Sequence, residues 1–482
     1  MFYHSTRSES YRADSAQAVL EGLAPDGGLY VPESLPAFDW KACLMADSSM
    51  DMSTMILSAF LPDIPDMPNL VKRAYTGKFE TDHLTPTVPV GDFGVLELFR
   101  GPTSAFKDVA LSMLPQLLTA AKDVIGQEKD ILILTATSGD TGKAALEGFH
   151  DVPGIKICVF YPEGGVSQVQ RAQMVTQEGN NVAVCAVYGN FDDAQTGVKN
   201  IFTGCRGREM KVALSSANSI NIGRLTPQIM YYFRSYRDLL DAGRISLGDE
   251  VNFSVPTGNF GDILAGYLAK LLGLPVGKLI CASNANNVLT DFIRTGTYDR
   301  MRPLLKTTSP SMDILVSSNL ERLLYMLSGD TSLVAGLMGK LTKEGAYTVP
   351  AELKEKIQSQ FTAYCCDDAR AEEIMGRVWN THHYLCDPHT ASGWAAAEDY
   401  IAETGDNRAM VVLSTASPYK FPVAVLTAIG GDTSGTEFEQ MARLSALTGV
   451  PVPGNLSGLE GKEEKHTGVI EKDAMLEYVL SL

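Results

Sequence analysis

The chain has 482 residues, of which 45% are hydrophobic and 20% are charged. This balance is typical of a folded globular protein, so it excludes a mostly disordered chain, a collagen-like repeat and a small disulfide-stapled scaffold. The formal net charge of −17 disfavours binding to nucleic acid or to an anionic membrane surface, because phosphate groups repel an acidic surface. A cleft with its own local positive charge is compatible with this total.

The eight cysteines show no Cys-x-x-Cys spacing, and several lie inside apolar runs. This pattern indicates reduced, buried thiols rather than a disulfide framework or a zinc site. The first seven residues lack the charged and then apolar order of a signal peptide. Since no run of about 18 apolar residues occurs either, we expect a cytoplasmic protein without a membrane span.

The N-terminal 90 residues carry short helical patterns separated by Pro62, Pro65 and Pro68. From about residue 95, short apolar runs alternate with helical patterns, and strands this apolar are covered on both faces. The order of strand, turn, helix and strand therefore predicts parallel sheets with right-handed crossovers. The expected strands are 131–135, 155–160, 182–187, 252–255 and 410–413.

Composition divides the chain into three expected parts. Residues 1–90 form an N-terminal domain, 91–430 form an α/β region of two lobes, and 431–482 form a C-terminal segment. Within the second part, residues 296–375 are richer in helical patterns and methionine, with Ser309–Pro310–Ser311 as the expected start of a helix.

Two glycine-containing segments follow expected strands, where ligands bind in open α/β sheets. Residues 137–143 place small side chains at a helix start, where free backbone N–H groups favour an anion. A P-loop is excluded, because that pattern needs glycine at Thr137 and serine or threonine at Ala144. Residues 256–262 lack a Gly-x-Gly-x-x-Gly pattern, which favours a single phosphate over a dinucleotide. A turn without a ligand is the alternative for both segments.

Lys107 comes just before the apolar helical pattern of Leu111, Leu114 and Leu118, hence near a helix N-terminus. The positive end of the helix dipole lowers the pKa of a lysine there, which suits a lysine that bonds covalently to a ligand. A solvent-facing lysine is the alternative, since lysines are mostly exposed. Residues 413–422 place small hydroxyl side chains after an apolar strand, where they hydrogen-bond a ligand or only form a turn.

Together and in this order, these segments resemble the long-chain threonine synthases, a family of pyridoxal-phosphate enzymes of fold type II. The resemblance covers nearly the whole chain, and the ordered set of motifs is far more specific than any one of them. It implies an α/β fold with two open, twisted, mostly parallel sheets flanked by helices, plus an N-terminal domain. The matching residues are 3–7, 26–32, 101–108, 137–142 and 258–262.

The resemblance also implies the cofactor, pyridoxal 5'-phosphate, and the residues of the site. Lys107 would bond to the cofactor, and Thr415 would hydrogen-bond its ring nitrogen. The cofactor phosphate would be held by Gly258, Asn259, Phe260, Gly261 and Asp262. The residues near the substrate carboxylate and the cofactor ring would be Ser138, Gly139, Asp140 and Thr141.

The block 215–224 also resembles a family segment, and it is expected to bind the substrate phosphate. One guanidinium with several neutral donors suits that group. For Arg224, a helix-surface ion pair is the alternative. The residues of this block expected to contact the phosphate are Ser216, Asn218, Asn221 and Arg224.

One motif departs from the family pattern. The usual Thr-Ala-His-Pro reads Thr-Ala-Ser-Pro at residues 415–418, so no role of a histidine carries over to Ser417. His382, His383 and His389 are close in sequence, but adjacent histidines lack zinc-ligand spacing. We therefore expect solvated or core histidines and no metal.

The implied reaction converts O-phospho-L-homoserine and water to L-threonine and phosphate. The expected partner is this small-molecule substrate alone, and the expected assembly is a monomer or a small homo-oligomer. Three alternatives stay open. They are a phospholyase that yields 2-oxobutyrate, ammonia and phosphate, another fold type II enzyme such as a dehydratase, and a non-catalytic ligand-binding relative. The long N-terminal segment argues against the second, and the intact Lys107 against the third.

Overall fold

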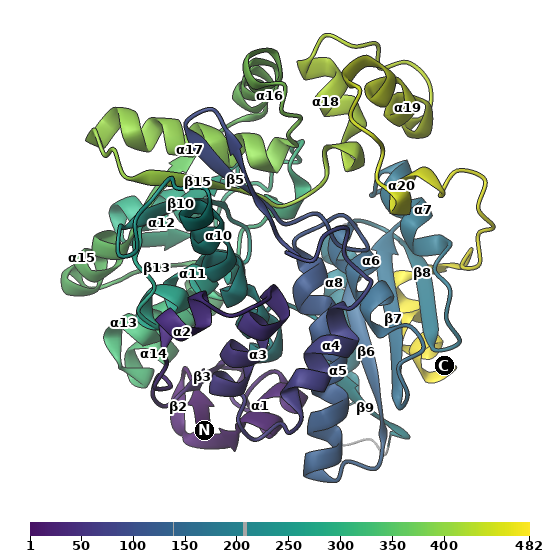
Figure 1. Cartoon of the computed structure of the whole chain (residues 1–482). Coiled ribbons are helices and arrows are strands. Elements are labelled where there is room, and N and C mark those ends of the chain that lie inside the picture. The colour runs from purple at the N-terminus through teal and green to yellow at the C-terminus, as the bar shows by residue number, and fades with distance from the viewer. Residues whose placement is uncertain (138, 206–209) are drawn as a thin grey trace.

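The computed structural model describes residues 1–137, 139–205 and 210–482. Two lobes are each built around a sheet, and the larger sheet has the strand order β14-β11-β10-β15-β5-β4 (Figure 1). Its neighbouring strands run parallel, except for the antiparallel pair β4 and β5. The strands are β4 (Thr87–Val90), β5 (Phe93–Glu97), β10 (Val251–Pro256), β11 (Val276–Ser283), β14 (Phe361–Cys365) and β15 (Ala409–Ser414).

The second sheet is wholly parallel and has the order β16-β8-β7-β6-β9. Its last strand in sequence, β16, pairs with β8 and so returns the C-terminal part of the chain to this lobe. The strands are β6 (Asp130–Ala136), β7 (Ile155–Pro162), β8 (Val182–Tyr188), β9 (Val212–Ser215) and β16 (Val469–Glu471). The five strands expected from apolar runs are therefore confirmed as β6, β7, β8, β10 and β15.

The apolar runs have a physical reason, because both faces of each sheet are buried. In β6, Ile131 and Ile133 join the core shared with α5 (Lys107–Ile125) and α6 (Asp140–Phe149). The intervening Leu132 and Leu134 join a separate cluster with α8 (Phe191–Gly204) and α21 (Met475–Leu480). The larger sheet is likewise covered by α17 (Pro388–Thr404) on one face, and by α10 (Ile229–Asp241) and α11 (Gly261–Leu271) on the other.

The N-terminal residues form a small sheet of order β2-β1-β3 and four helices, drawn in purple in Figure 1. Helices α1 and α4 pack against α5, and α3 packs against α10, so this region contacts both lobes. The elements are β1 (Phe2–Ser5), β2 (Ser8–Asp14), α1 (Ser15–Glu21), β3 (Tyr30–Pro32), α2 (Trp40–Leu44), α3 (Ser49–Phe60) and α4 (Met67–Tyr75).

The segment expected to be helix-rich contains α13, α14, α15 and the start of α16, but it also supplies the edge strand β14 of the larger sheet. Ser309–Pro310–Ser311 lies at a single 3-10 turn, η2 (Pro310–Met312), instead of starting a longer helix. The elements here are β12 (Thr297–Asp299), α13 (Leu320–Ser328), α14 (Thr331–Glu344), β13 (Ala346–Thr348) and α15 (Ala351–Gln360).

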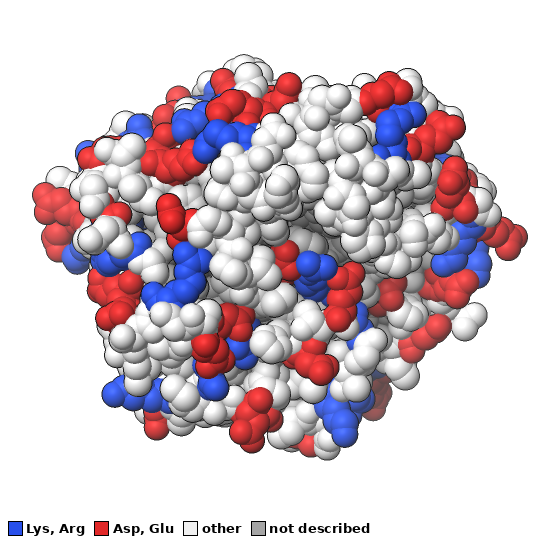
Figure 2. Space-filling model, turned by 45° about the horizontal axis from the view of Figure 1, so that its top comes forward, with Lys and Arg blue, Asp and Glu red and all other residues white. Residues whose placement is uncertain are grey.

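The remaining elements connect and cover the two lobes. They are α7 (Gln168–Val175), α9 (Ile222–Leu225), η1 (Thr226–Gln228), α12 (Val288–Thr295), α16 (Asp368–His382), η3 (Pro418–Lys420), α18 (Pro422–Ala428), α19 (Glu437–Thr448), α20 (Gly454–Ser457) and η4 (Lys472–Ala474). Among the described residues, no helix combines the length and apolar character needed to cross a membrane. Figure 2 shows acidic and basic side chains mixed over one face of the molecule.

Candidate active site

Four loops that follow β5, β6, β10 and β15 meet between the two sheets. The backbone N–H of Phe106 donates to the carbonyl of Thr415 at 2.8 Å, which joins the loops after β5 and β15. The amine of Lys107 lies 3.9 Å from a carboxylate oxygen of Asp140, which joins the loops after β5 and β6. Since the carboxyl ends of parallel strands share one edge of a sheet, this is where a ligand site is expected.

Lys107 is the first residue of α5 and is buried, with 7% of its surface exposed. Burial is the largest cause that lowers its pKa to about 8, and the charges of Lys420 and Arg224 act in the same direction, against Asp140. A larger fraction of this amine is therefore uncharged near neutral pH than in an ordinary lysine. The placement at a helix start is confirmed, and the solvent-facing alternative for Lys107 is wrong.

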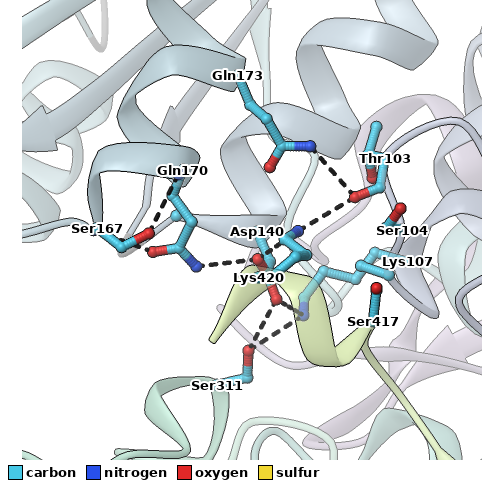
Figure 3. A network of polar contacts seen from close by, with 12 residues as sticks. Thr103, Ser104, Lys107, Asp140, Ser167, Gln170, Gln173, Ser311, Ser417 and Lys420 are labelled. Atoms are coloured by element: carbon cyan, nitrogen blue, oxygen red, sulfur yellow. Dashed lines mark hydrogen bonds and ion pairs between the residues drawn. The ribbon is translucent and has the colours of Figure 1, made fainter. Parts of the chain in front are cut away.

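Asp140 lies at the centre of a polar cluster around Lys107 (Figure 3). One carboxylate oxygen is 2.6 Å from the amine of Lys420 and also accepts from Gln170 at 3.0 Å. Ser311 donates from its hydroxyl to the other oxygen at 3.4 Å. Although burial alone would raise the pKa of Asp140, the charges of Lys420 and Lys107 hold it well below its usual value. Asp140 is therefore an anion in this cluster.

Gly139 explains how Gln170 reaches Asp140. Its φ of +140° is disfavoured for other residues, and a Cβ there would lie 2.4 Å from the side chain of Gln170. The Gln170 side chain also closes a capping box with Ser167 at the start of α7. Thr141 is half-buried in the first turn of α6. The predicted site residue Ser138 lies outside the described residues.

The loop between β10 and α11 carries the expected phosphate-binding segment. Phe260 has a left-handed φ of +60° and precedes Gly261, the first residue of α11, whose first-turn N–H groups have no partner within the helix. Asn259 is exposed, and its carbonyl accepts from the side chain of Asn319 at 3.1 Å. A Cβ at Gly258 would lie 2.5 Å from the carbonyl oxygen of Ser311, so only glycine allows this close approach.

Asp262, the second residue of α11, is buried and accepts from the hydroxyl of Tyr232 at 3.1 Å through one carboxyl oxygen. Its other oxygen has no hydrogen-bond partner among the described residues. Burial raises the pKa of Asp262 to about 7. Burial also raises the pKa of Asp108 to about 6, against hydrogen bonds from Thr103.

Arg224, in α9, is buried with 3% of its surface exposed, so the alternative of a helix-surface ion pair is wrong. One guanidinium nitrogen donates to the carbonyl of Ala217 at 2.6 Å, and Nε has no hydrogen-bond partner among the described residues. Burial lowers its pKa to about 10, and its charge acts on Lys107. A buried guanidinium with an unpartnered nitrogen is a strong donor for an anion, because an unpaired buried charge is costly.

The other predicted phosphate donors of the block 215–224 are placed differently. Asn221 is fully buried, but its amide caps α9 at the N–H of Gly223 and donates to the carbonyl of Val19 at 2.9 Å. Those bonds favour a structural role for Asn221, which ties the block to α1. Ser216 is half-buried and accepts from the backbone N–H of Asn218, whose side chain is exposed.

Several residues of this cluster, Gln170 among them, were not expected from the sequence as site residues. Lys420 follows Thr415 on the turn η3, and Ser311 is 3.4 Å from the amine of Lys107. His389 accepts at Nε2 from the backbone N–H of Ser311 at 3.2 Å, and its Nδ1 lies 2.6 Å from Asp387. His389 is thus a core histidine, one of the two predicted readings. The only sequence signal for Lys420 was its position inside the hydroxyl-rich segment 413–422.

His382 and His383, the other two histidines of that run, are exposed. In the part of the chain that the structure describes, no group of three or more histidine, cysteine, aspartate or glutamate side chains is placed to hold a metal ion.

Comparison with known proteins identifies the family. The model for pyridoxal-phosphate dependent enzymes matches residues 85–415, and models for the threonine synthase N terminus and C-terminal region match residues 2–75 and 390–479. The threonine synthase of Saccharomyces cerevisiae is 39% identical over 464 residues, which cover 89% of each chain. The chain belongs to the threonine synthase family. The family and fold expected from the sequence motifs are confirmed.

Two further members show how far the likeness extends. A crystal structure of pyridoxal-phosphate-bound threonine synthase from Brucella melitensis matches with a TM-score of 0.88 at 37% identity, over 100% of this chain and 99% of that one. The human protein named threonine synthase-like 1 is 38% identical over 458 residues, which cover 90% of this chain and 61% of that protein. The chain thus spans about three-fifths of the length of that curated relative.

The site fits pyridoxal phosphate, the cofactor of this enzyme family. Lys107 supplies a buried amine with a lowered pKa, as a lysine that bonds to an aldehyde requires. The start of α11 supplies N–H groups, which suit a phosphate. Arg224 Nε and Asp262 Oδ2 are buried and without hydrogen-bond partners among the described residues, so the protein alone leaves these two polar atoms of the site unsatisfied.

Proposed function

We propose that this protein converts O-phospho-L-homoserine and water to L-threonine and phosphate with pyridoxal phosphate as its cofactor. The observation that carries the proposal is the buried amine of Lys107, which shares one charged cluster with Arg224, whose Nε has no hydrogen-bond partner among the described residues. The first group suits a cofactor aldehyde, and the second suits a dianionic phosphate within a protein of net charge −17. Membership of the threonine synthase family supports the same substrate.

Lys107 has two tasks in this proposal. Its amine would hold the cofactor, and as a free amine it would move protons at Cα and Cβ of the substrate and at C4′ of the cofactor. When bound, the cofactor supplies an electron sink that stabilises negative charge on the substrate carbons. The lowered pKa of Lys107 lets the amine accept and return a proton near neutral pH, because its uncharged form is populated there far more than that of an ordinary lysine.

The other predicted residues divide into two proposed groups. Gly258, Asn259, Phe260, Gly261 and Asp262, in the loop before α11 and its first turn, would hold the cofactor phosphate, and the hydroxyl of Thr415 would hydrogen-bond the ring nitrogen. A neutral hydroxyl does not force protonation of that nitrogen, unlike a carboxylate. The substrate phosphate is bound by Arg224 with Ser216 and Asn218, and this group excludes Asn221, whose amide has other partners.

The proposed role of Asp140 changes with the structure. As an anion, its side chain repels a substrate carboxylate, so it does not bind that group. Its carboxylate instead joins Lys107 to Lys420. Ser138, Gly139 and Thr141 stay the residues proposed to lie beside the substrate carboxylate, through the N–H groups at the start of α6.

We also propose a cytoplasmic protein that acts as a monomer or a small homo-oligomer. The eight cysteines support a reducing compartment, since all have free thiols and seven are buried. The division into 1–90, 91–430 and 431–482 stays a prediction. Light scattering measures the assembly, and limited proteolysis measures the boundaries.

A product assay in ¹⁸O-labelled water tests the proposed reaction. The cofactor-loaded protein should release phosphate and threonine in a 1:1 ratio from O-phospho-L-homoserine, with the label in the threonine hydroxyl group. Formation of 2-oxobutyrate and ammonia in a 1:1 ratio with phosphate would identify a phospholyase instead. Absence of phosphate release from a protein that binds the cofactor would favour a non-catalytic relative.

A further inference from the structure

A second lysine, Lys420, is buried more deeply than Lys107 and has no catalytic task in the function proposed above. Its side chain is 0% exposed, and its amine lies 2.6 Å from Asp140 Oδ1. The amine also donates to the carbonyl of Thr103 at 3.1 Å. A buried lysine is costly unless it is paired, so the pair with Asp140 accounts for its presence here.

Asp140 lies between two lysine amines at unequal distances. The distance to Lys107 is 3.9 Å, compared with 2.6 Å to Lys420, and the two amines face different oxygens of the carboxylate (Figure 3). The attraction between opposite charges falls with distance, and at 2.6 Å a hydrogen bond adds to it. The negative charge of Asp140 is therefore neutralised mainly by Lys420.

The other charged groups that face Lys107 do not replace this pair. The charge of Arg224, in α9, lowers the pKa of Lys107, and the negative charge of Asp108, next in α5, raises it less than that of Asp140 does. Asp262 approaches from α11, and its raised pKa of about 7 leaves it partly protonated near neutral pH. Asp140 is thus the charged group that most strongly favours the protonated form of Lys107, and Lys420 opposes it.

We propose that Lys420 is a positioning residue for Lys107: by holding Asp140 in a buried ion pair, it keeps the amine of Lys107 available as an uncharged nucleophile and base. Without Lys420, the carboxylate is free to pair with Lys107 and to stabilise its ammonium form, which has no lone pair to react with an aldehyde. The proposal rests on the proposed role of Lys107 in the function given above.

The test measures the proton affinity of Lys107 in the cofactor-free protein. Competitive labelling with acetic anhydride across a pH series, followed by peptide mass spectrometry, gives the midpoint at which the Lys107 amine loses its proton. Lys420→Met should raise this midpoint by about one pH unit or more, as expected when an opposite charge gains a new partner. Lys420→Arg retains the charge and should keep the midpoint close to that of the unchanged protein.

Two further variants separate this role from a purely structural one. Asp140→Asn removes the negative charge and leaves Lys420 in place, so the Lys107 midpoint should fall below that of the unchanged protein, even if Lys420→Met does not fold. The double variant Lys420→Met/Asp140→Asn should reverse the increase in the Lys107 midpoint that Lys420→Met causes. Lys122→Met removes a lysine from a more exposed lysine–aspartate pair at the other end of α5 and should leave the Lys107 midpoint unchanged.

The results that overturn the proposal are distinct from those that overturn the function. An unchanged or lower midpoint in folded Lys420→Met contradicts the positioning role, as does an unchanged midpoint in Asp140→Asn. If the unchanged protein forms threonine while these midpoints stay fixed, only the role of Lys420 fails. If borohydride fixes the cofactor to a lysine other than Lys107, the assignment on which the proposal rests is wrong.

Discussion

The imidazole of His389 accepts a hydrogen bond from the backbone N–H of Ser311 at 3.2 Å, although 78 residues separate them. Since Nε2 accepts here, the proton of the neutral ring is on Nδ1, where it donates to Asp387 at 2.6 Å. The buried pair Asp387 and His389 therefore holds the loop that presents the Ser311 hydroxyl to Lys107 and Asp140.

Replacement of His389 tests this support. His389→Ala removes both bonds and leaves Asp387 short of a donor, so it should destabilise the protein by about 2–4 kcal/mol and weaken cofactor binding. Thermal unfolding and cofactor titration measure the two effects. His382→Ala is the matched control, because that histidine is exposed, and it should change either quantity little. Equal effects of the two substitutions would contradict the supporting role.

Lys107→Ala should abolish turnover, because the amine that bonds to the cofactor and moves protons is lost. Borohydride reduction followed by mass spectrometry should then find no cofactor attached to the protein. Lys143→Ala is the control, since that lysine also lies near a helix start but pairs with Glu147 outside the cluster. A cofactor still fixed by borohydride in Lys107→Ala would identify another lysine as the attachment point.

Arg224→Ala should raise KM for O-phospho-L-homoserine much more than it weakens cofactor binding. Loss of a charged hydrogen bond to phosphate costs about 2–4 kcal/mol, equivalent to roughly a thirtyfold to thousandfold change. Steady-state kinetics and cofactor titration separate the two effects, and Arg73→Ala, which removes an exposed arginine bond to Gln116, is the control. If cofactor affinity falls while KM and kcat per bound cofactor stay constant, Arg224 holds the cofactor phosphate instead.

The two glycines of the β10–α11 loop should respond differently to a methyl group. The atom nearest to a Cβ at Gly261 would be Asn319 Nδ2, at 3.5 Å, so Gly261→Ala fits the protein. Gly261→Ala should therefore weaken the binding of pyridoxal phosphate about tenfold, which is roughly 1.4 kcal/mol. The affinity for pyridoxal, which has no phosphate, should stay unchanged. At Gly258 the Cβ would meet a backbone oxygen at 2.5 Å, so Gly258→Ala should lower the melting temperature. Equal weakening of both ligands by Gly261→Ala would contradict phosphate binding there.

Asp262 makes the stability of the cofactor-free protein depend on pH. Burial raises its pKa to about 7, whereas the unfolded chain titrates near pH ~4, so the folded state keeps a proton that the unfolded state loses. This contribution to stability is present below about pH 4 and is lost as the pH rises towards about 7. Asp262→Asn should remove it, changing the slope of unfolding free energy by up to about 1.4 kcal/mol per pH unit.

Urea unfolding of the cofactor-free proteins between about pH 4 and pH 7 measures that slope. Asp92→Asn, at an exposed position, is the control and should keep the slope of the unchanged protein. Identical slopes for Asp262→Asn and the unchanged protein would show that Asp262 does not retain its proton in the folded state.

The sequence alone determined the parts of this protein that depend on neighbouring residues. Strands β6, β7, β8, β10 and β15 were predictable, because burial of both sheet faces requires unbroken apolar runs. Lys107 was predictable at a helix start, because the apolar pattern of α5 begins just after it. The ordered motifs identified the family, since their combination is far more specific than each motif.

Only the tertiary structure decided which side chains share the site. Lys420 and Asp140 are 280 positions apart, and they meet because β15 and β5 are neighbours in one sheet and α6 of the other lobe faces them. Ser311 reaches Lys107 through a loop held by His389, and Asn221 turns towards Val19 instead of the cluster. Local patterns report periodicity and turn chemistry, whereas these contacts depend on strand order and on the packing of distant loops, which no local pattern specifies.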